Sequence, residues 1–334
     1  MRSEPCVIFE PKGQPFQEEK QKFLGSSLAK AQISMGPVWL SKRYNHVMAD
    51  SFIPRRPVIT AYPRMPEAFA EAQAMSAYLK ERGIEAPFGS LFDENLRKRV
   101  RRGEFDMLII AGGDGSVLRA GHLSAPSNVP ILGVNLGTIG FLIQVEQEEW
   151  REYFDKLLNG EAWIENRMML HVEHIRAGEV LGSWDALNEI VVARGQIVRP
   201  IRLSALVDGR LLASYVADGL IASTPTGSTA YALAAGGPIL PPELRNILLV
   251  PIAPHLSVDR AVVLSEGSMV TMQVNSENAV LSIDGQPSIS LMEDDHVDVC
   301  AAEVTAQFVR FGDPGYFYQN LTAHMNENSL GLPR

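Results

Sequence analysis

The sequence has little of what marks secreted, membrane-bound or nucleic-acid-binding proteins. Only two cysteines, Cys6 and Cys300, occur in 334 residues, which excludes a disulfide framework and favours a reducing compartment. No apolar run is long enough to span a bilayer or to resemble the apolar part of a signal peptide. The net charge of −9 argues against a broad basic face for nucleic acid. We therefore expect a cytoplasmic protein with neither a membrane nor a nucleic-acid partner.

Two common nucleotide-binding motifs are also absent. A Walker A loop needs Gly-Lys followed by Ser or Thr, and the chain has no Gly-Lys dipeptide. A dinucleotide-binding turn needs G-x-G-x-x-G, and counting from Gly113 and Gly115 places Leu118 where the third glycine should be. Any nucleotide chemistry in this chain must therefore use a different glycine turn.

Such a turn is present as Gly112-Gly113-Asp114-Gly115-Ser116. Residues 105–110 before it have the composition of a buried strand, and the residues from Ser116 onward predict a helix that Ser116 caps. Backbone N–H groups converge at a strand–turn–helix junction and bind anions, and Asp114 adds a carboxylate. This combination indicates phosphoryl transfer, although a plain strand-to-helix turn would have the same local pattern.

The hydrophobic pattern divides the chain into segments of different character. Residues 1–54 form an extension with little core of its own, whereas 55–146 alternate strands and helices and predict a parallel α/β sheet. Residues 147–300 are mostly strand-like, with a hairpin turn at Asp208-Gly209, and 301–334 are expected to return to the α/β domain. Ligands bind a parallel sheet at the carboxyl ends of its strands, where the glycine-rich turns at 112–115 and 135–142 fall.

Two polar segments interrupt the β-rich half. Residues 218–231 are rich in hydroxyls and small side chains, which suit the adenine, ribose and phosphates of a nucleotide, although a hydroxyl-rich helix cap is the alternative. Asn188 and Glu189 can hold ribose hydroxyls or a base edge. On a regular strand only one of them can face a buried ligand, and an exposed polar strand start is the alternative. The 283–286 segment reads first as a hairpin turn and second as a ligand contact.

Five segments in one order make the chain resemble the NAD kinase family: 112–116, 133–142, 187–189, 218–231 and 251–255. The resemblance implies an α/β N-terminal domain, a parallel sheet flanked by helices, followed by a mostly β C-terminal domain with the active site between them. It also implies transfer of the γ-phosphoryl group of ATP to the 2′-hydroxyl of the adenosine ribose of NAD, which makes NADP.

The resemblance assigns roles position by position. It implies Asp114 as the candidate general base, which can remove the proton of a poorly nucleophilic sugar hydroxyl. The positions matching the phosphate- and ATP-binding residues are Gly112, Gly113, Ser116 and Arg119. Those matching the NAD-binding residues are Gly115, Asn135, Phe141, Leu142, Asn188, Glu189, Asp218, Thr226, Thr229, Ala230 and Tyr231.

The resemblance further implies a divalent cation and self-association. Mg²⁺ or another divalent cation would neutralise phosphate charge and arrive with ATP, without an assigned protein ligand, although Asp114 could contact the metal instead of acting as base. A homo-oligomer, dimer or tetramer, is implied as well. Ser116 stands where many members carry Thr, which keeps the hydroxyl.

Two other functions remain compatible with the residues. One is a catalytically silent NAD(P)-binding sensor, and the other is a different kinase with a Gly-Gly-Asp-Gly turn, acting on a lipid or a sugar phosphate. The sequence leaves open ATP against polyphosphate as donor, NAD against NADH as acceptor, and feedback by NADP(H).

Overall fold

The computed structural model describes residues 52–321 except 138–139, 198, 256–258, 314 and 319–320. The predicted extension over 1–54 falls outside these residues apart from 52–54, and so do the last residues of the chain. Within the described part, no helix is long and apolar enough to cross a membrane.

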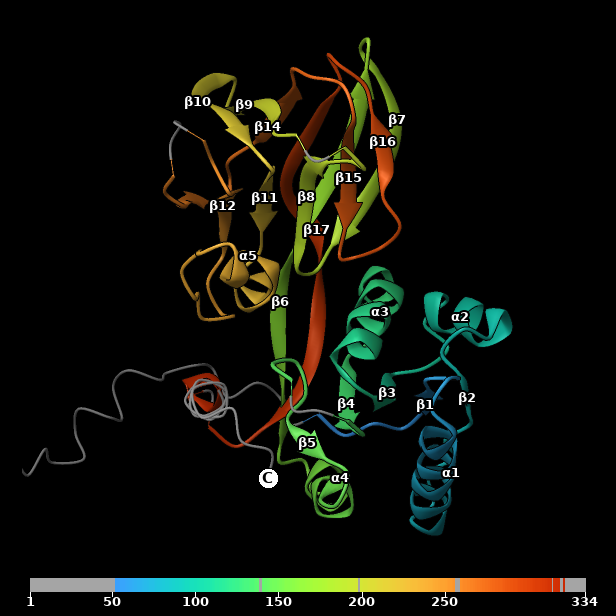
Figure 1. Ribbon diagram of the computed structural model, residues 1–334. Helices are drawn as coiled ribbons and strands as arrows, with labels where there is room; N and C mark the ends of the chain where they lie inside the picture. The colour runs from blue at the N-terminus through green and yellow to red at the C-terminus, as the bar shows by residue number, and fades with distance from the viewer. Residues whose placement is uncertain are drawn as a thin grey trace, which may run out of the picture. The chain divides into compact units, whose positions relative to one another are not determined.

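The first half alternates strands and helices, as predicted (Figure 1). Strands β2, β1, β3 and β4 pair in parallel in that order, and β5 adds to β4. The elements are β1 (Pro57–Ala61), α1 (Pro66–Glu81), β2 (Phe88–Ser90), α2 (Glu94–Arg101), β3 (Met107–Gly112), α3 (Asp114–Ser124), η1 (Ala125–Ser127), β4 (Ile131–Asn135), β5 (Val145–Glu146) and α4 (Trp150–Leu158).

Strand β3 shows why this sheet needs helices on both faces. Its alternate residues enter two different cores: Met107 and Ile109 pack with α1 and α4, whereas Leu108 and Ile110 pack with α3. All six residues of β3 are buried, as in strands covered on both sides. The glycine turn therefore begins at the end of a fully packed strand, which fixes its position.

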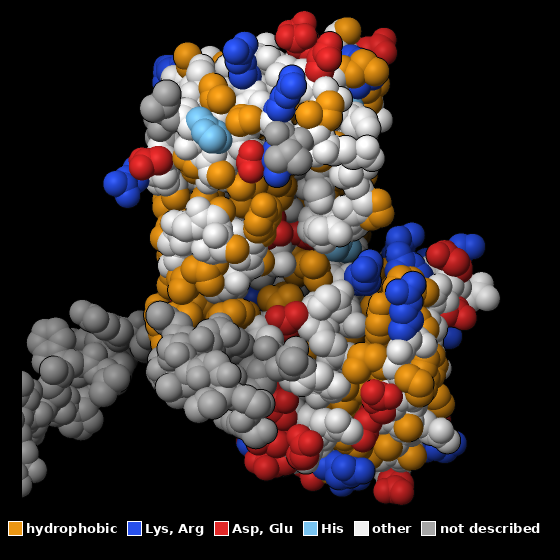
Figure 2. Space-filling model, viewed as in Figure 1, with side chains coloured by type: hydrophobic (Ala, Val, Ile, Leu, Met, Phe, Trp, Pro, Cys, Tyr) orange, Lys and Arg blue, Asp and Glu red, His pale blue; other side chains and the backbone are white. Residues whose placement is uncertain are grey.

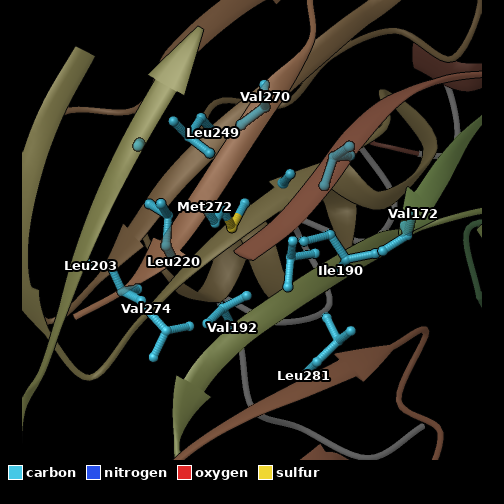
Figure 3. Close-up of a cluster of buried hydrophobic side chains, with 14 of the residues drawn as sticks. Val172, Ile190, Val192, Leu203, Leu220, Leu249, Val270, Met272, Val274 and Leu281 are labelled. Atoms are coloured by element: carbon cyan, nitrogen blue, oxygen red, sulfur yellow. The ribbon is translucent and has the colours of Figure 1, made fainter. Parts of the chain in front are cut away.

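The second half is antiparallel and consists of two sheets packed face to face. Inward side chains such as Ile190, Leu220 and Met272 form their common core (Figure 3). The elements are β6 (Ala162–Arg176), β7 (Glu179–Ala186), β8 (Glu189–Arg194), β9 (Ile201–Val207), β10 (Arg210–Ala217), β11 (Gly219–Ser223), η2 (Thr226–Thr229), α5 (Tyr231–Ala234), β12 (Asn246–Ile252), β13 (Val262–Ser265), β14 (Val270–Val274), β15 (Ala279–Ile283), β16 (Ile289–Leu291) and β17 (His296–Phe311).

The long strand β17 joins the two halves. Near its start it pairs with β14, and at Phe308 it pairs in parallel with Ile131 of β4. One sheet therefore runs β10-β9-β14-β17-β4-β3-β1-β2, with β5, β6 and β7 beside this path, and the other runs β13-β12-β11-β8-β15-β16. The predicted fold class, an α/β part followed by an antiparallel β part, is confirmed.

Local details depart from the predictions in three places. Helix α3 begins at Asp114 with Gly113 as its N-cap, so the prediction that Ser116 caps the helix is wrong. The helix expected over 230–235 is only the four-residue α5 after the 3₁₀ turn η2. Strand β7 was not predicted, because only one of its eight residues is buried and its side chains show no regular alternation. The hairpin turn at Asp208-Gly209 is confirmed, with positive φ at both residues.

Candidate active site

The carboxylate of Asp114 lies at the first turn of α3 and is held by a second segment, residues 140–142. The N–H of Phe141 donates to Oδ2 at 2.8 Å, and the N–H of Leu142 donates to both oxygens at 3.3 Å. Gly140 lies directly against the carboxylate, where any Cβ would collide with it. Burial raises the pKa of the Asp114 carboxyl, while the two N–H donors and then Arg167 and Arg310 oppose this shift.

The glycine turn before α3 has one packed and two open positions. A Cβ on Gly112 would lie 2.8 Å from Oγ of Ser116, so a larger residue here would displace the Ser116 side chain. A Cβ on Gly113 or Gly115 would meet no atom within 4 Å, so both face open space. The first N–H groups of a helix have no partner within the helix, and here they border that space. The turn can therefore accept an anion beside the Asp114 carboxylate.

A buried ionic cluster supports the 140–142 segment from behind. Glu165 Oε2 accepts hydrogen bonds from Arg167 at 3.0 Å and Arg310 at 2.8 Å, and the Tyr316 hydroxyl contacts the same carboxylate. Burial alone would raise the pKa of Glu165, but the two guanidinium groups hold it at about 2. Arg310 also donates through Nη1 to the carbonyl of Leu142 at 2.9 Å. The cluster thus fixes the residue that donates to Asp114.

Asp284 connects the two halves of the site. Its carboxylate accepts from the backbone N–H groups of Leu187, Asn188 and Glu189 at 2.7 to 2.9 Å. It also lies 2.6 Å from Nε2 of His122, two turns along α3 from Asp114. The predicted turn at 283–286 is confirmed, with Asp284 and the next residue at positive φ. No local pattern in the sequence indicates that this turn residue anchors the 187–189 segment.

Asn188 and Glu189 each present a buried oxygen without a partner among the described residues, Oδ1 and Oε2 respectively. Glu189 is 7% exposed, so the alternative of an exposed strand start is wrong for this residue. Burial raises the pKa of Glu189 to about 8, and the nearby Asp284 carboxylate adds to the shift. Unpartnered buried acceptors are unfavourable, and hydroxyl or amino groups of a ligand would satisfy them.

The raised pKa of Glu189 predicts a pH-dependent stability. From pH 4.5 to about 8 the unfolded chain ionises this group while the folded chain keeps it protonated, so stability falls as pH rises through this window. Glu189→Gln removes that loss. We expect the variant to gain up to about 5 kcal/mol over wild type at pH 8, and little at pH 5, in urea unfolding. Glu293→Gln, at an exposed glutamate, serves as control. A gain independent of pH would contradict the prediction.

The turn after β11 contributes to the same region. Ser223 Oγ donates to the Asn188 carbonyl at 3.1 Å, and Gly227 packs so closely on that carbonyl that no side chain would fit. Thr226 is buried, and Thr229 Oγ1 donates to its carbonyl at 3.2 Å. Ala230 is the N-cap of the short helix α5.

The remaining sequence-assigned residues include Asn135, which pairs with Gly112 across the sheet, and Ser116, which packs against Gly112. Asp218 lies directly before β11, about 17 Å from the other end of that strand at Ser223. Its carboxylate pairs with Arg194 at 3.1 Å. Tyr231 is 45% exposed. The side chain of Asn135 bonds within its own turn and to Glu146 at 3.0 Å. Ser116 is buried inside the first turn of α3, and Arg119 lies exposed on the same helix.

Comparisons with known proteins agree with this architecture. The chain matches the family model of the ATP-NAD kinase N-terminal domain over residues 39–162 and that of the ATP-NAD kinase C-terminal domain over residues 187–311. It is 39% identical over 264 residues to an NAD kinase of Heliobacterium modesticaldum, covering 75% of this chain and 92% of that protein. It is 41% identical over 224 residues to an NAD kinase of Chloroflexus aggregans, covering 67% and 81%.

Solved structures share the fold. An NAD kinase from Archaeoglobus fulgidus in complex with ATP superposes with a TM-score of 0.65 at 26% identity, over 81% of this chain and 98% of that chain. Yeast NADH kinase complexed with NADH superposes with a TM-score of 0.70 at 24% identity, over 83% and 89%.

Proposed function

The chain belongs to the NAD kinase family and is a phosphotransferase, and we propose that it moves the γ-phosphoryl group of ATP to the 2′-hydroxyl of the adenosine ribose of NAD, with Asp114 as general base. The observation that carries the proposal is the Asp114 carboxylate, held by two N–H donors beside a glycine turn that faces open space. The carboxylate can take the proton of a hydroxyl acceptor, and the neighbouring anion site can hold the phosphates of the donor.

Asp114 would receive the proton of the 2′-hydroxyl as the oxygen attacks phosphorus. Its ionised form is needed, and the N–H donors and the two buried arginines stabilise that form. Burial raises the pKa of the carboxyl, which makes it a stronger base than an exposed aspartate. Most of the rate enhancement would come from alignment of donor and acceptor in the site.

The acceptor nucleoside would occupy the side of Asp114 that faces β8. The unpartnered oxygens of Asn188 and Glu189 would accept hydrogen bonds from its hydroxyl or amino groups. Leu142, next to Phe141, would line the same side, and the turn with Thr226, Thr229 and Ala230 would close it. This assignment is supported by the two buried acceptors, which have no hydrogen-bond partner among the described residues. A bound ligand would supply those hydrogen bonds.

The phosphates of ATP would lie on the glycine turn. Gly112, Gly113, Gly115 and Ser116 supply its backbone, and the start of α3 supplies the favourable dipole. We propose that Mg²⁺ or another divalent cation enters on these phosphates, since no group of three metal-binding side chains is arranged to hold an ion in the described residues. When bound, the cation would neutralise phosphate charge.

The function is tested with purified protein, NAD, ATP and Mg²⁺ in an assay coupled to an NADP-specific dehydrogenase. We expect NADP to form. NAD binding without NADP formation would contradict the proposal and favour a silent NAD(P)-binding sensor. The same assay with polyphosphate as donor and with NADH as acceptor, followed by direct product analysis, defines the substrate range.

We also propose that the chain works as a homo-oligomer, dimer or tetramer. Strand β10 ends one sheet and exposes apolar side chains, Leu211 by 64% and Leu212 and Val216 by 39% each. Asp218 lies at the end of β11 opposite the 187–189 segment, and Tyr231 is 45% exposed, so both are placed where a neighbouring copy could contact them. Light scattering should find an oligomer at assay concentrations, and a fully active monomer would contradict this proposal.

A further inference from the structure

Three side chains gather at the carboxyl edge of the parallel strands, beside the glycine turn. Tyr62 directly follows β1, Phe92 follows β2, and Arg119 projects from α3, which follows β3. The rings of Tyr62 and Phe92 lie 6.1 Å apart, and the Arg119 guanidinium is 5.8 Å from the Phe92 ring. Phe92 is 46% exposed, so its ring is accessible to a ligand. We call these three residues the aromatic platform.

The aromatic platform adjoins the glycine turn. The N–H of Tyr62 donates to the carbonyl of Ala111 at 3.3 Å. The Cβ of Tyr62 is 3.8 Å from the place that a Cβ on Gly112 would take. A ligand whose phosphates lie on the turn could therefore extend over Tyr62 onto Phe92. Ligands of parallel sheets bind at this edge of the strands.

The aromatic platform and the proposed acceptor site lie on different sides of α3. His122 turns toward Asp284 and the 187–189 segment, whereas Arg119 turns toward Phe92, ahead of α2. In phosphoryl transfer, attacking and leaving oxygens approach the phosphorus roughly in line from opposite sides. If the acceptor nucleoside lies beside Asn188 and Glu189, the donor nucleoside must leave in the other direction, toward the aromatic platform.

The charge of this face suits a polyanion. Arg119 is exposed, and Arg97 of α2 donates to the carbonyl of Leu91, the neighbour of Phe92, at 3.4 Å. Figure 2 shows Lys and Arg side chains gathered over this part of the molecule, although the whole chain carries a net charge of −9. A local cationic region on an acidic protein raises the local concentration of an anionic ligand.

We propose that Tyr62 and Phe92 form a subsite for the nucleoside of the donor, with the purine base stacked on Phe92, beside the phosphate contact that the family resemblance already implies for Arg119. This subsite rests on the proposed function and extends it to the nucleoside of ATP. Every base offers a π-face to an aromatic ring, so the platform should accept other nucleoside triphosphates as well. Phosphate chains without a base should gain nothing from Phe92.

Binding of the non-hydrolysable analogue AMP-PNP by calorimetry, at saturating NAD so that the acceptor side is filled, tests the subsite. Phe92→Ala should weaken AMP-PNP binding about tenfold, within the range found when a base-stacking aromatic is replaced by alanine. The affinity for inorganic tripolyphosphate should stay unchanged. Arg119→Ala should weaken both ligands, and Phe92→Trp should restore AMP-PNP binding. In turnover, Phe92→Ala should raise KM for ATP and leave KM for NAD unchanged.

Phe88→Ala is the matched control, because Phe88 is 42% exposed at the opposite end of β2 and should affect neither ligand. Unchanged AMP-PNP affinity in Phe92→Ala would overturn the proposal. Equal weakening of AMP-PNP and tripolyphosphate would also overturn it, because stacking involves only the base. Since binding is measured without turnover, a wild-type protein that binds AMP-PNP and makes no NADP would contradict the proposed function and still test the platform.

Discussion

Asp114→Asn is expected to lower kcat for NADP formation by about 10²–10⁴-fold, the usual contribution of a general base, while the Kd for NAD changes little. The amide keeps the size of the side chain but cannot take the proton of the 2′-hydroxyl. Kinetics with the coupled assay and calorimetric titration of NAD measure the two quantities separately. Asp208→Asn, in a turn whose positive φ asparagine also tolerates, is the matched control and should retain full activity.

The pH profile of the wild type provides an independent test of the same role. The base acts in its ionised form, so kcat/KM should fall as pH decreases through the pKa of Asp114. Burial raises that pKa above 3.8, so the acidic limb should lie at a higher pH than for an exposed aspartate. An Asp114→Asn enzyme within threefold of wild type, or one that keeps the acidic limb, would contradict the assignment.

Arg310→Met is expected to lower the free energy of unfolding by about 3–5 kcal/mol, because removing one partner of a buried ion pair leaves the other charge uncompensated. Arg310 is 2% exposed and bonds both Glu165 and the Leu142 carbonyl. Urea unfolding near pH 7 measures the loss. It should shrink in acid, since Glu165 contributes stability above its ordinary pKa of 4.5 and loses it as pH falls toward 2.

Arg245→Met is the matched control for this prediction. Arg245 also forms a two-bond pair, with Glu266, but both side chains are about two-fifths exposed, so the expected loss is at most about 1 kcal/mol. Equal losses of unfolding free energy in the two variants would contradict the prediction, because burial of the Glu165 cluster would then make no difference to stability. The Arg310 variant should also lose activity, because Leu142 donates to Asp114.

The strand and helix pattern of the first half was readable from the sequence, because the apolar runs coincide with buried strands and the turn residues lie between them. Gly83 follows α1 with a φ of 81°, a conformation that glycine adopts readily at the end of a helix. Ser116 was misassigned because serine is a common N-cap, whereas the N-cap here is Gly113, three residues earlier, and Ser116 lies inside the first turn of the helix. Strand β7 pairs with β6 but has no buried face that would leave a pattern.

The site was only partly readable from the sequence. The order of motifs pointed to Asp114, Asn188 and Glu189, and two of these prove to be buried acceptors without partners. Asp284 appeared as a turn residue, and nothing in its local pattern revealed bonds to residues 95 to 97 positions away. Arg167 and Arg310 look like ordinary charged residues of two strands, which come together only because β6 and β17 pair along their length.

Local sequence therefore specifies the glycine turn, the alternation of elements and the chemical groups available to the site, because these depend on conformational preferences and burial patterns over a few residues. The charge states of Asp114, Glu165 and Glu189 depend instead on which distant side chains and backbone N–H groups surround each carboxyl in a buried environment. Long-range strand pairing brings those groups together, and it turns three similar carboxyls into a candidate base, a permanent anion and a protonated acid.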